Sequence, residues 1–219
     1  MSRVLGVLGG MGPAATLAFL ARVQALTPAR VDEDHIRVIA DINPQVPNRH
    51  TQPEAAGRAL GEMAQALNTA GAQVLAMPCN TAHAHAGAIR AAGLPFIDMV
   101  AETARAAAGT GARRVGVLAT PGGMRLYAEA LAAEGLAMVA LPAEGERFMQ
   151  VVFAVKAGDV GPDQRAAMRD LAQALIAAGA EAVIGGCTEV PLLLDQADVS
   201  APLIDSAEVL ARACVAACR

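Results

Sequence analysis

Short apolar runs alternate with longer segments rich in alanine along the whole chain. The runs are short enough for buried strands, and the segments between them have helical length and periodicity. The predicted strands are residues 3–9, 35–41, 72–78, 94–98, 112–119, 136–141, 181–186 and 201–205. The predicted helices are residues 13–27, 53–70, 82–92, 98–109, 122–134, 144–157 and 162–178, a short helix near 189–195 and a last helix to the C-terminus. This regular alternation predicts an α/β fold with parallel sheets covered by helices.

Three stretches of the first half recur, in the same order, in the second half. "RVLGVLGGMGP" resembles "RVGVLATPGG", "AGAQVLAMPCNTA" resembles "AGAEAVIGGCTEV", and "LPFIDMVAETARAA" resembles "APLIDSAEVLARA". The three pairs are separated by nearly the same distance along the chain, which indicates an internal repeat. We therefore expect two pseudo-symmetric α/β domains, residues 1–101 plus 207–219 and residues 102–206, with the last helix returning to the first domain.

Two of the four cysteines, Cys79 and Cys187, end strands that are equivalent in the repeat. Ligands of open parallel sheets bind beyond the carboxyl ends of the strands. The pattern therefore predicts a site in an interdomain cleft with the two thiols opposed. Each cysteine also precedes a predicted helix, whose N-terminal N–H groups favour a thiolate and a lowered pKa. Buried packing is the alternative for a single cysteine at a strand end.

A thiolate can act as a base, a nucleophile or a metal ligand. His83 and His85 follow Cys79, but the spacing CxxxHxH is not a strong zinc pattern. A single Cys–His nucleophile would leave the second cysteine without a role. Two opposed acid/base groups use both, because one removes a proton from a carbon while the other protonates its opposite face. Such inversion needs no cofactor where desolvation and hydrogen bonds stabilise the carbanion.

Polar side chains beside the cysteines are candidates for binding a carboxylate. Asn80 and Thr81 follow Cys79, Thr188 follows Cys187, and Thr120 ends the first strand of the second domain. Their alternative role is N-capping of the helices that follow.

Two cations are further candidates for binding the substrate. Arg49 lies in the long loop after the second strand, and its guanidinium suits bidentate binding of a carboxylate. Lys156 is the only lysine of the chain. Its alternative role is that of a cation at a helix C-terminus before Gly158.

The segment "GMGPAA" at 10–15 fits the loose dinucleotide-binding pattern GxGxxA. Pro13 lies inside it, however, and the acidic residues Asp32 and Asp34 precede the second strand instead of ending it. The segment is therefore predicted to form a tight turn with backbone N–H groups near a small anion. Met11, in this turn, is a further substrate-binding candidate.

Composition excludes several classes of protein. Aromatic residues make up 2% of the chain, the net charge is −4, and no basic patch is visible, so nucleic-acid binding is not expected. Glycines and Pro13 interrupt the N-terminal apolar run, which argues against a signal peptide, and no apolar stretch has the length of a membrane span. We expect a cytoplasmic protein with reduced cysteines, and Cys214 and Cys218 as packing residues of a helix.

Three motifs together carry a resemblance to a known family. "LGGMGPAAT" at 8–16, "PCNTAH" at 78–83 and "GGCTEVPLL" at 185–193 resemble the aspartate/glutamate racemase family, most closely its aspartate racemase branch. The resemblance implies two pseudo-symmetric domains with the site between them, no pyridoxal phosphate, no metal, and Cys79 and Cys187 as catalytic acid/bases. The glutamate branch usually has GCTHYP, so Glu189 favours the aspartate branch.

The resemblance also implies that Arg49, in "NPQVPNRH", and Lys156, in "VKAGD", bind the substrate. Many relatives have PDRT where this chain has "PNRH", and Asn48 and His50 could alter the side-chain pocket.

The leading hypothesis is a cofactor-independent racemase that interconverts L- and D-aspartate. The alternatives are a glutamate or broad-specificity racemase, a maleate-type cis–trans isomerase, a non-catalytic sensor of small acids and a dinucleotide-binding protein. The only expected partners are a small amino-acid substrate and, as the family implies, a second copy of the chain in a homodimer.

Overall fold

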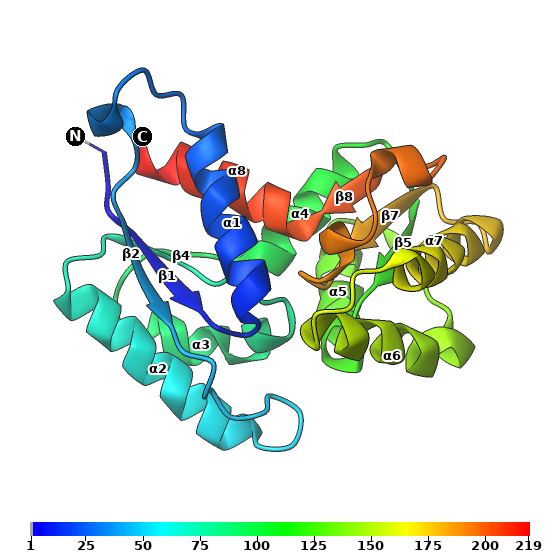
Figure 1. Cartoon of the computed structure of the whole chain (residues 1–219), viewed down its shortest axis with the longest axis horizontal. Coiled ribbons are helices and arrows are strands. Elements are labelled where there is room, and N and C mark those ends of the chain that lie inside the picture. The colour runs from blue at the N-terminus through cyan, green and yellow to red at the C-terminus, as the bar shows by residue number, and fades with distance from the viewer. Residues whose placement is uncertain (1) are drawn as a thin grey trace. The chain divides into compact units, whose positions relative to one another are not determined.

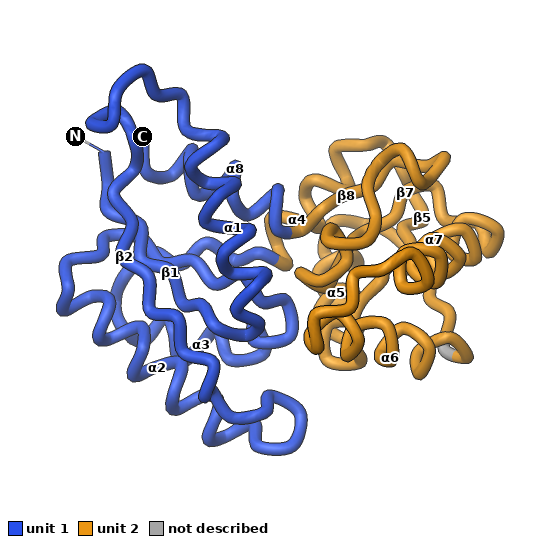
Figure 2. The backbone as a smooth tube through the Cα atoms, viewed as in Figure 1, with its two compact units in different colours: residues 1–99, 207–219 blue, residues 100–206 orange. Residues whose placement is uncertain are grey.

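The computed structural model describes residues 2–219, and their contacts divide the chain into two compact units. The first unit contains the residues up to Met99 together with Ala207–Arg219, and the second contains Val100–Ser206. Figure 2 shows the two units in different colours. Each unit is built around a single parallel sheet.

The sheet of the first unit has the strand order β2-β1-β3-β4. Its strands are β1 (Leu5–Gly9), β2 (Val38–Ile42), β3 (Val74–Ala76) and β4 (Phe96–Ile97). The helical segments in this part of the chain are α1 (Pro13–Leu26), η1 (Asp32–Asp34), α2 (Pro53–Thr69), η2 (Thr81–His85), α3 (Ala86–Arg90) and α8 (Ser206–Cys218), where η marks a 3₁₀ turn (Figure 1). All strand pairs are parallel.

Alternation of side chains along the strands divides the core of the first unit into two layers. Val74 of β3 faces a cluster that contains side chains of α1 and α8, whereas Leu75 faces a cluster that contains side chains of α2 and α3. Cys214 and Cys218 lie in the α8 cluster with 0% and 1% of their surfaces exposed, so the prediction that they are packing residues is confirmed.

The second unit repeats this topology, with the strand order β6-β5-β7-β8. Its strands are β5 (Arg114–Leu118), β6 (Ala137–Val139), β7 (Ala182–Gly185) and β8 (Leu203–Asp205). Its helical segments are α5 (Pro121–Ala133), η3 (Pro142–Glu144), α6 (Gly145–Lys156), α7 (Pro162–Ala177), η4 (Val190–Leu192) and η5 (Gln196–Asp198). The helix α4 (Met99–Ala108) begins at Met99 in the first unit and continues into the second unit. The predicted fold, two parallel sheets flanked by helices, is confirmed.

Prolines account for the start of four helices. The helices α1, α2, α5 and α7 each begin at a proline, whose fixed φ suits a first helical turn and whose missing N–H would have no partner there. Within residues 2–219, no helix is long and apolar enough to cross a membrane.

Two predicted helices are shorter than the sequence suggested. The segment predicted as a helix over 82–92 begins as a 3₁₀ turn and becomes α-helical only at Ala86. The helix predicted near 189–195 is only the turn η4, which contains Pro191. Proline removes a backbone donor, so a longer helix through this segment would lose a hydrogen bond. The turns η1, η3 and η5 were not predicted.

Candidate active site

The strand order places two loops of the first unit at the point where the direction of the crossovers reverses. The chain leaves β1 toward β2 on one side and then returns to β3 on the other, so the loops after β1 and β3 diverge. Met11 is in the first of these loops and Cys79 in the second, and both are buried in the same cluster. The structure therefore places these two predicted site residues in the same buried cluster of the first unit.

The glycine turn after β1 fits closely against the neighbouring loop. Gly10 has φ of 98°, and a Cβ at this position would approach the backbone carbonyl carbon of Asn43 to within 2.3 Å. Its N–H donates to Thr16 Oγ1 at 3.0 Å. The turn predicted for "GMGPAA" is present, but this N–H is occupied within the protein and does not point to an anion.

Asn80 and Thr81 continue the loop from Cys79 into η2. Asn80 is buried and Thr81 is half-buried. Asn80 occupies the N-cap position of η2, but its side chain makes no capping hydrogen bond. The capping alternative therefore does not account for this asparagine.

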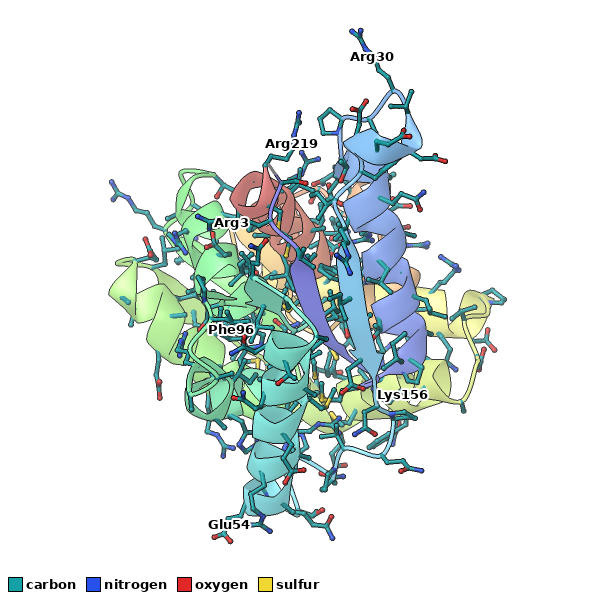
Figure 3. The ribbon with its side chains drawn as sticks, turned by 90° about the vertical axis from the view of Figure 1, so that its left-hand side faces the viewer. Arg3, Arg30, Glu54, Phe96, Lys156 and Arg219 are labelled. Atoms are coloured by element: carbon teal, nitrogen blue, oxygen red, sulfur yellow. The ribbon has the colours of Figure 1, made fainter. Side chains whose placement is uncertain are left out.

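His83 connects the cysteine loop to the start of α4. The backbone N–H of Met99 donates to His83 Nε2 at 3.0 Å, so the ring proton lies on Nδ1, which donates to the carbonyl of Cys79 at 2.9 Å. The ring also contacts Phe96 with 5.3 Å between centroids, and Phe96 on β4 is labelled in Figure 3. Burial is the main reason that the pKa of His83 is lowered.

With both ring nitrogens in hydrogen bonds to the backbone, His83 supports the loop and is not available as a metal ligand or a base. The described residues contain no group of three or more His, Cys, Asp or Glu side chains that could hold a metal ion.

Arg49 lies in the loop after β2, where the Asn48 side chain organises a turn by accepting hydrogen bonds from the N–H groups of His50 and Thr51. Two polar atoms in this region are buried without a hydrogen-bond partner, Arg49 Nε and His85 Nε2. Burial lowers the pKa of His85, and the positive charge of Arg49 lowers it further, so the two side chains interact electrostatically. A buried donor without an acceptor is costly, and the carboxylate of a ligand would supply one.

In the second unit, Thr120 and Thr188 follow β5 and β7, the equivalents of β1 and β3. Thr120 is the N-cap of α5, and its Oγ1 accepts from the N–H of Gly123 at 3.2 Å, so the capping alternative is confirmed for this residue. Thr188 is buried beside Cys187. The two loops lie close together, because a Cβ on Gly186 would approach that of Ala119 to 3.1 Å.

Cys187, Glu189 and Lys156 form a continuous chain of polar contacts. The Cys187 thiol donates to Glu189 Oε2 at 2.9 Å, and Lys156 Nζ donates to Glu189 Oε1 at 2.5 Å. The Glu189 side chain is 5% exposed and that of Lys156 36% exposed. Lys156, labelled in Figure 3, is the last residue of α6, and Gly158, with φ of 96°, follows the C-cap residue Ala157. The helix-end position of Lys156 is therefore compatible with a contact at the site.

The prediction of a lowered pKa is wrong for Cys187. Burial and the adjacent negative charge of Glu189 raise the pKa of this thiol well above its usual range, and Lys156 offsets this only in part. The reason is local. The segment after Cys187 is a short 3₁₀ turn instead of a helix, and the nearest charge is a carboxylate.

The sequence singled out Glu189 only as a marker of one branch, and His85 only as an improbable metal ligand. A signal was present for Glu189, since it is a single carboxylate within the apolar segment 182–194 and the chain has a single lysine to pair with it. No comparable signal marks His85.

A duplicated parallel sheet with a buried thiol after the third strand of each copy defines a two-domain α/β protein. The sequence profile of the Asp/Glu/Hydantoin racemase family matches residues 8–214, and the chain belongs to this family. It is thus an isomerase of the racemase type. The predicted family resemblance is confirmed.

Solved structures and curated relatives agree with this assignment. An aspartate racemase from Picrophilus torridus superposes with a TM-score of 0.84 at 26% identity, over 99% of this chain and 94% of that chain. An aspartate racemase homologue from Pyrococcus horikoshii gives 0.81 at 25% identity, over 99% and 98%. The broad specificity amino-acid racemase RacX of Bacillus subtilis is 27% identical over 97% of this chain and 96% of its own length.

Proposed function

We propose that the protein is a cofactor-independent racemase that interconverts L- and D-aspartate by a two-base mechanism with Cys79 and Cys187. The observation that carries the proposal is the equivalence of the two thiols. Each is buried and follows the third strand of a sheet with the same strand order, in the segment where ligands of parallel sheets bind. Two acid/base groups meet the minimum requirement for inverting a carbon that carries an acidic hydrogen.

In the proposed reaction, one sulfur acts as a thiolate and takes the α-proton, and the C–H electron pair remains on the substrate as an enolate of the α-carboxylate. The other cysteine then donates its S–H proton to the opposite face of the α-carbon. The extra negative charge on the carboxylate needs preorganised donors. Asn80, Thr81 and Thr188 are proposed to supply them, because they are the polar residues next to the two thiols.

The proposed substrate follows from the two cations. Arg49, with a buried Nε that has no protein partner, is proposed to bind the side-chain carboxylate, and Lys156 is proposed to share that role. Lys156 contacts Glu189 in this structure, so it would have to share its ammonium between Glu189 and the substrate. The names of the aspartate racemase and broad-specificity relatives are consistent with aspartate as one substrate.

Proton NMR of L-aspartate in D₂O, followed by chiral chromatography, tests the proposal with purified, reduced enzyme. We expect loss of the α-proton signal together with formation of D-aspartate. Cys79→Ala and Cys187→Ala should each abolish racemisation, whereas Cys218→Ala, which removes a buried thiol from α8, should retain it.

Racemisation by either single-cysteine variant would refute the two-base mechanism. Conversion of L-glutamate or L-alanine in place of L-aspartate would correct the substrate, and isomerisation of maleate alone would favour the isomerase alternative. We also propose a homodimer and a cytoplasmic location, and sedimentation equilibrium measures the first.

A further inference from the structure

The contact between Cys187 and Glu189 fixes where a proton lies. Lys156 Nζ forms a salt bridge with one oxygen of the Glu189 carboxylate. An ionised carboxylate can only accept hydrogen bonds. The hydrogen between Sγ and Oε2, which are 2.9 Å apart, must therefore be on the sulfur. A thiolate in the same place would put two anions in direct contact.

The surroundings of this contact reinforce the assignment. Thr188 Oγ1 lies 3.4 Å from Oε2 of the same carboxylate, as a second donor. Glu189 and Lys156 are the charged groups of the second unit that act on the Cys187 sulfur. The carboxylate is buried, so water does not screen its charge strongly.

We propose that Glu189 is a positioning residue that holds the exchangeable proton of the cysteine pair on Cys187 in the substrate-free enzyme. The assignment rests on the proposed two-base mechanism. It implies that the resting enzyme is prepared for the enantiomer from which Cys79 removes the α-proton, with Cys187 as the acid that protonates the opposite face.

The proton balance of the cycle follows. After turnover of that enantiomer, Cys79 carries the abstracted proton and Cys187 is a thiolate beside Glu189. Two adjacent anions make this state the less stable one. The enzyme therefore returns to rest when Cys79 releases its proton to water and Cys187 takes one from water. The opposite enantiomer reacts only with the less stable state, in which Cys187 is the thiolate, so a smaller fraction of the enzyme can convert it.

Alkylation by iodoacetamide as a function of pH tests the inference in the full chain without substrate. Trypsin releases Cys79 in peptide 59–90, Cys187 in peptide 170–212, and Cys214 with Cys218 in peptide 213–219, so mass spectrometry reads the two thiols separately. In the wild-type protein, we expect the labelling midpoint of Cys187 to lie above that of Cys79.

Glu189→Gln keeps the shape of the side chain and removes its charge. It should lower the labelling midpoint of Cys187 by at least about one pH unit, which corresponds to roughly tenfold faster labelling at a pH below the midpoint. The labelling midpoint of Cys79 should be unchanged. Glu189→Asp should keep the midpoint raised. Glu146→Gln, which removes the same charge at an exposed position of α6, should change neither midpoint.

A wild-type Cys187 midpoint at or below that of Cys79 would overturn the inference, and this comparison requires no variant to fold. An unchanged Cys187 midpoint in folded Glu189→Gln would overturn it as well. Because labelling needs no substrate, its outcome is independent of aspartate racemisation. A shifted midpoint in an enzyme that does not racemise aspartate would refute the proposed function alone, whereas racemisation with an unshifted midpoint would refute the role of Glu189 alone.

Discussion

His83 accepts a hydrogen bond from the backbone N–H of Met99, so a side chain just after the first cysteine holds the start of α4. The same ring donates to the carbonyl of Cys79. One buried imidazole thus provides a hydrogen-bond partner for two buried backbone groups, the Cys79 carbonyl and the Met99 N–H.

Replacement of this ring should therefore cost stability. His83→Ala leaves a buried N–H and a buried carbonyl without their partner, at about 1–3 kcal/mol for each unsatisfied group. We expect a reduced free energy of unfolding in urea. His35→Ala removes a histidine whose Nδ1 has no hydrogen-bond partner and should change stability little. Equal losses in the two variants would contradict the supporting role of His83.

The same histidine makes stability depend on pH. Burial lowers the pKa of His83 in the folded protein below its usual value, so the folded state binds a proton less readily than the unfolded state. Its contribution is present above the unfolded pKa of about 6.5 and is lost as the pH falls toward the folded pKa. Urea unfolding at pH 7.5 and 5.5 should show a larger loss of stability for wild type than for His83→Ala. An identical loss in both proteins would exclude this origin.

Arg49 should matter for the substrate and not for the fold. A charge-assisted hydrogen bond contributes about 1.5–3 kcal/mol, so Arg49→Ala should raise KM for aspartate by roughly 10- to 100-fold. The melting temperature should be nearly unchanged, because Arg49 Nε has no protein partner to lose. Arg58→Ala, at an exposed position of α2, is the matched control. A lower melting temperature with an unchanged KM would make Arg49 a structural residue.

Lys156 and Glu189 should be energetically coupled. Lys156→Met leaves the buried carboxylate without its cation, and we expect a loss of about 1–3 kcal/mol, less than for a fully buried pair because Lys156 is partly exposed. Adding Glu189→Gln should recover part of this loss, with a coupling of about 0.5–3 kcal/mol in a double-mutant cycle of urea unfolding. Additive losses would show that the contact contributes nothing beyond its separate parts.

The sequence predicts well those features that depend on local pattern. The apolar runs locate all eight strands found within residues 2–219, and prolines mark the starts of α1, α2, α5 and α7. Strand ends are less accurate, because backbone groups at the end of a run can bond elsewhere: the Met77 carbonyl accepts from the N–H of Cys79, and Pro78 has no N–H to donate. The run at 72–78 forms a ladder only over Val74–Ala76.

The site was predicted less completely, because its contacts join residues that are distant in the chain. Lys156 and Glu189 are 33 positions apart, and His83 and Met99 are 16 apart. The pKa of Cys187 was predicted in the wrong direction for a different, local reason, since Glu189 is only two residues away. The prediction of a lowered pKa used the general rule that N–H groups at a helix N-terminus favour a thiolate. In the structure, burial and the carboxylate beside the sulfur raise the pKa instead.

The shared strand order of the two sheets has an evolutionary consequence. A chain that arose by duplication and fusion of a half-length ancestor starts with two identical half-sites, and a symmetric pair of thiols has no preference for which one carries a proton. Fusion allows each half to mutate independently. The repeat aligns Cys79-Asn80-Thr81 with Cys187-Thr188-Glu189, so a carboxylate in one half stands where the other has a hydroxyl. A difference at that aligned position is enough to make two equivalent thiols chemically distinct, because a carboxylate contacts the Cys187 sulfur.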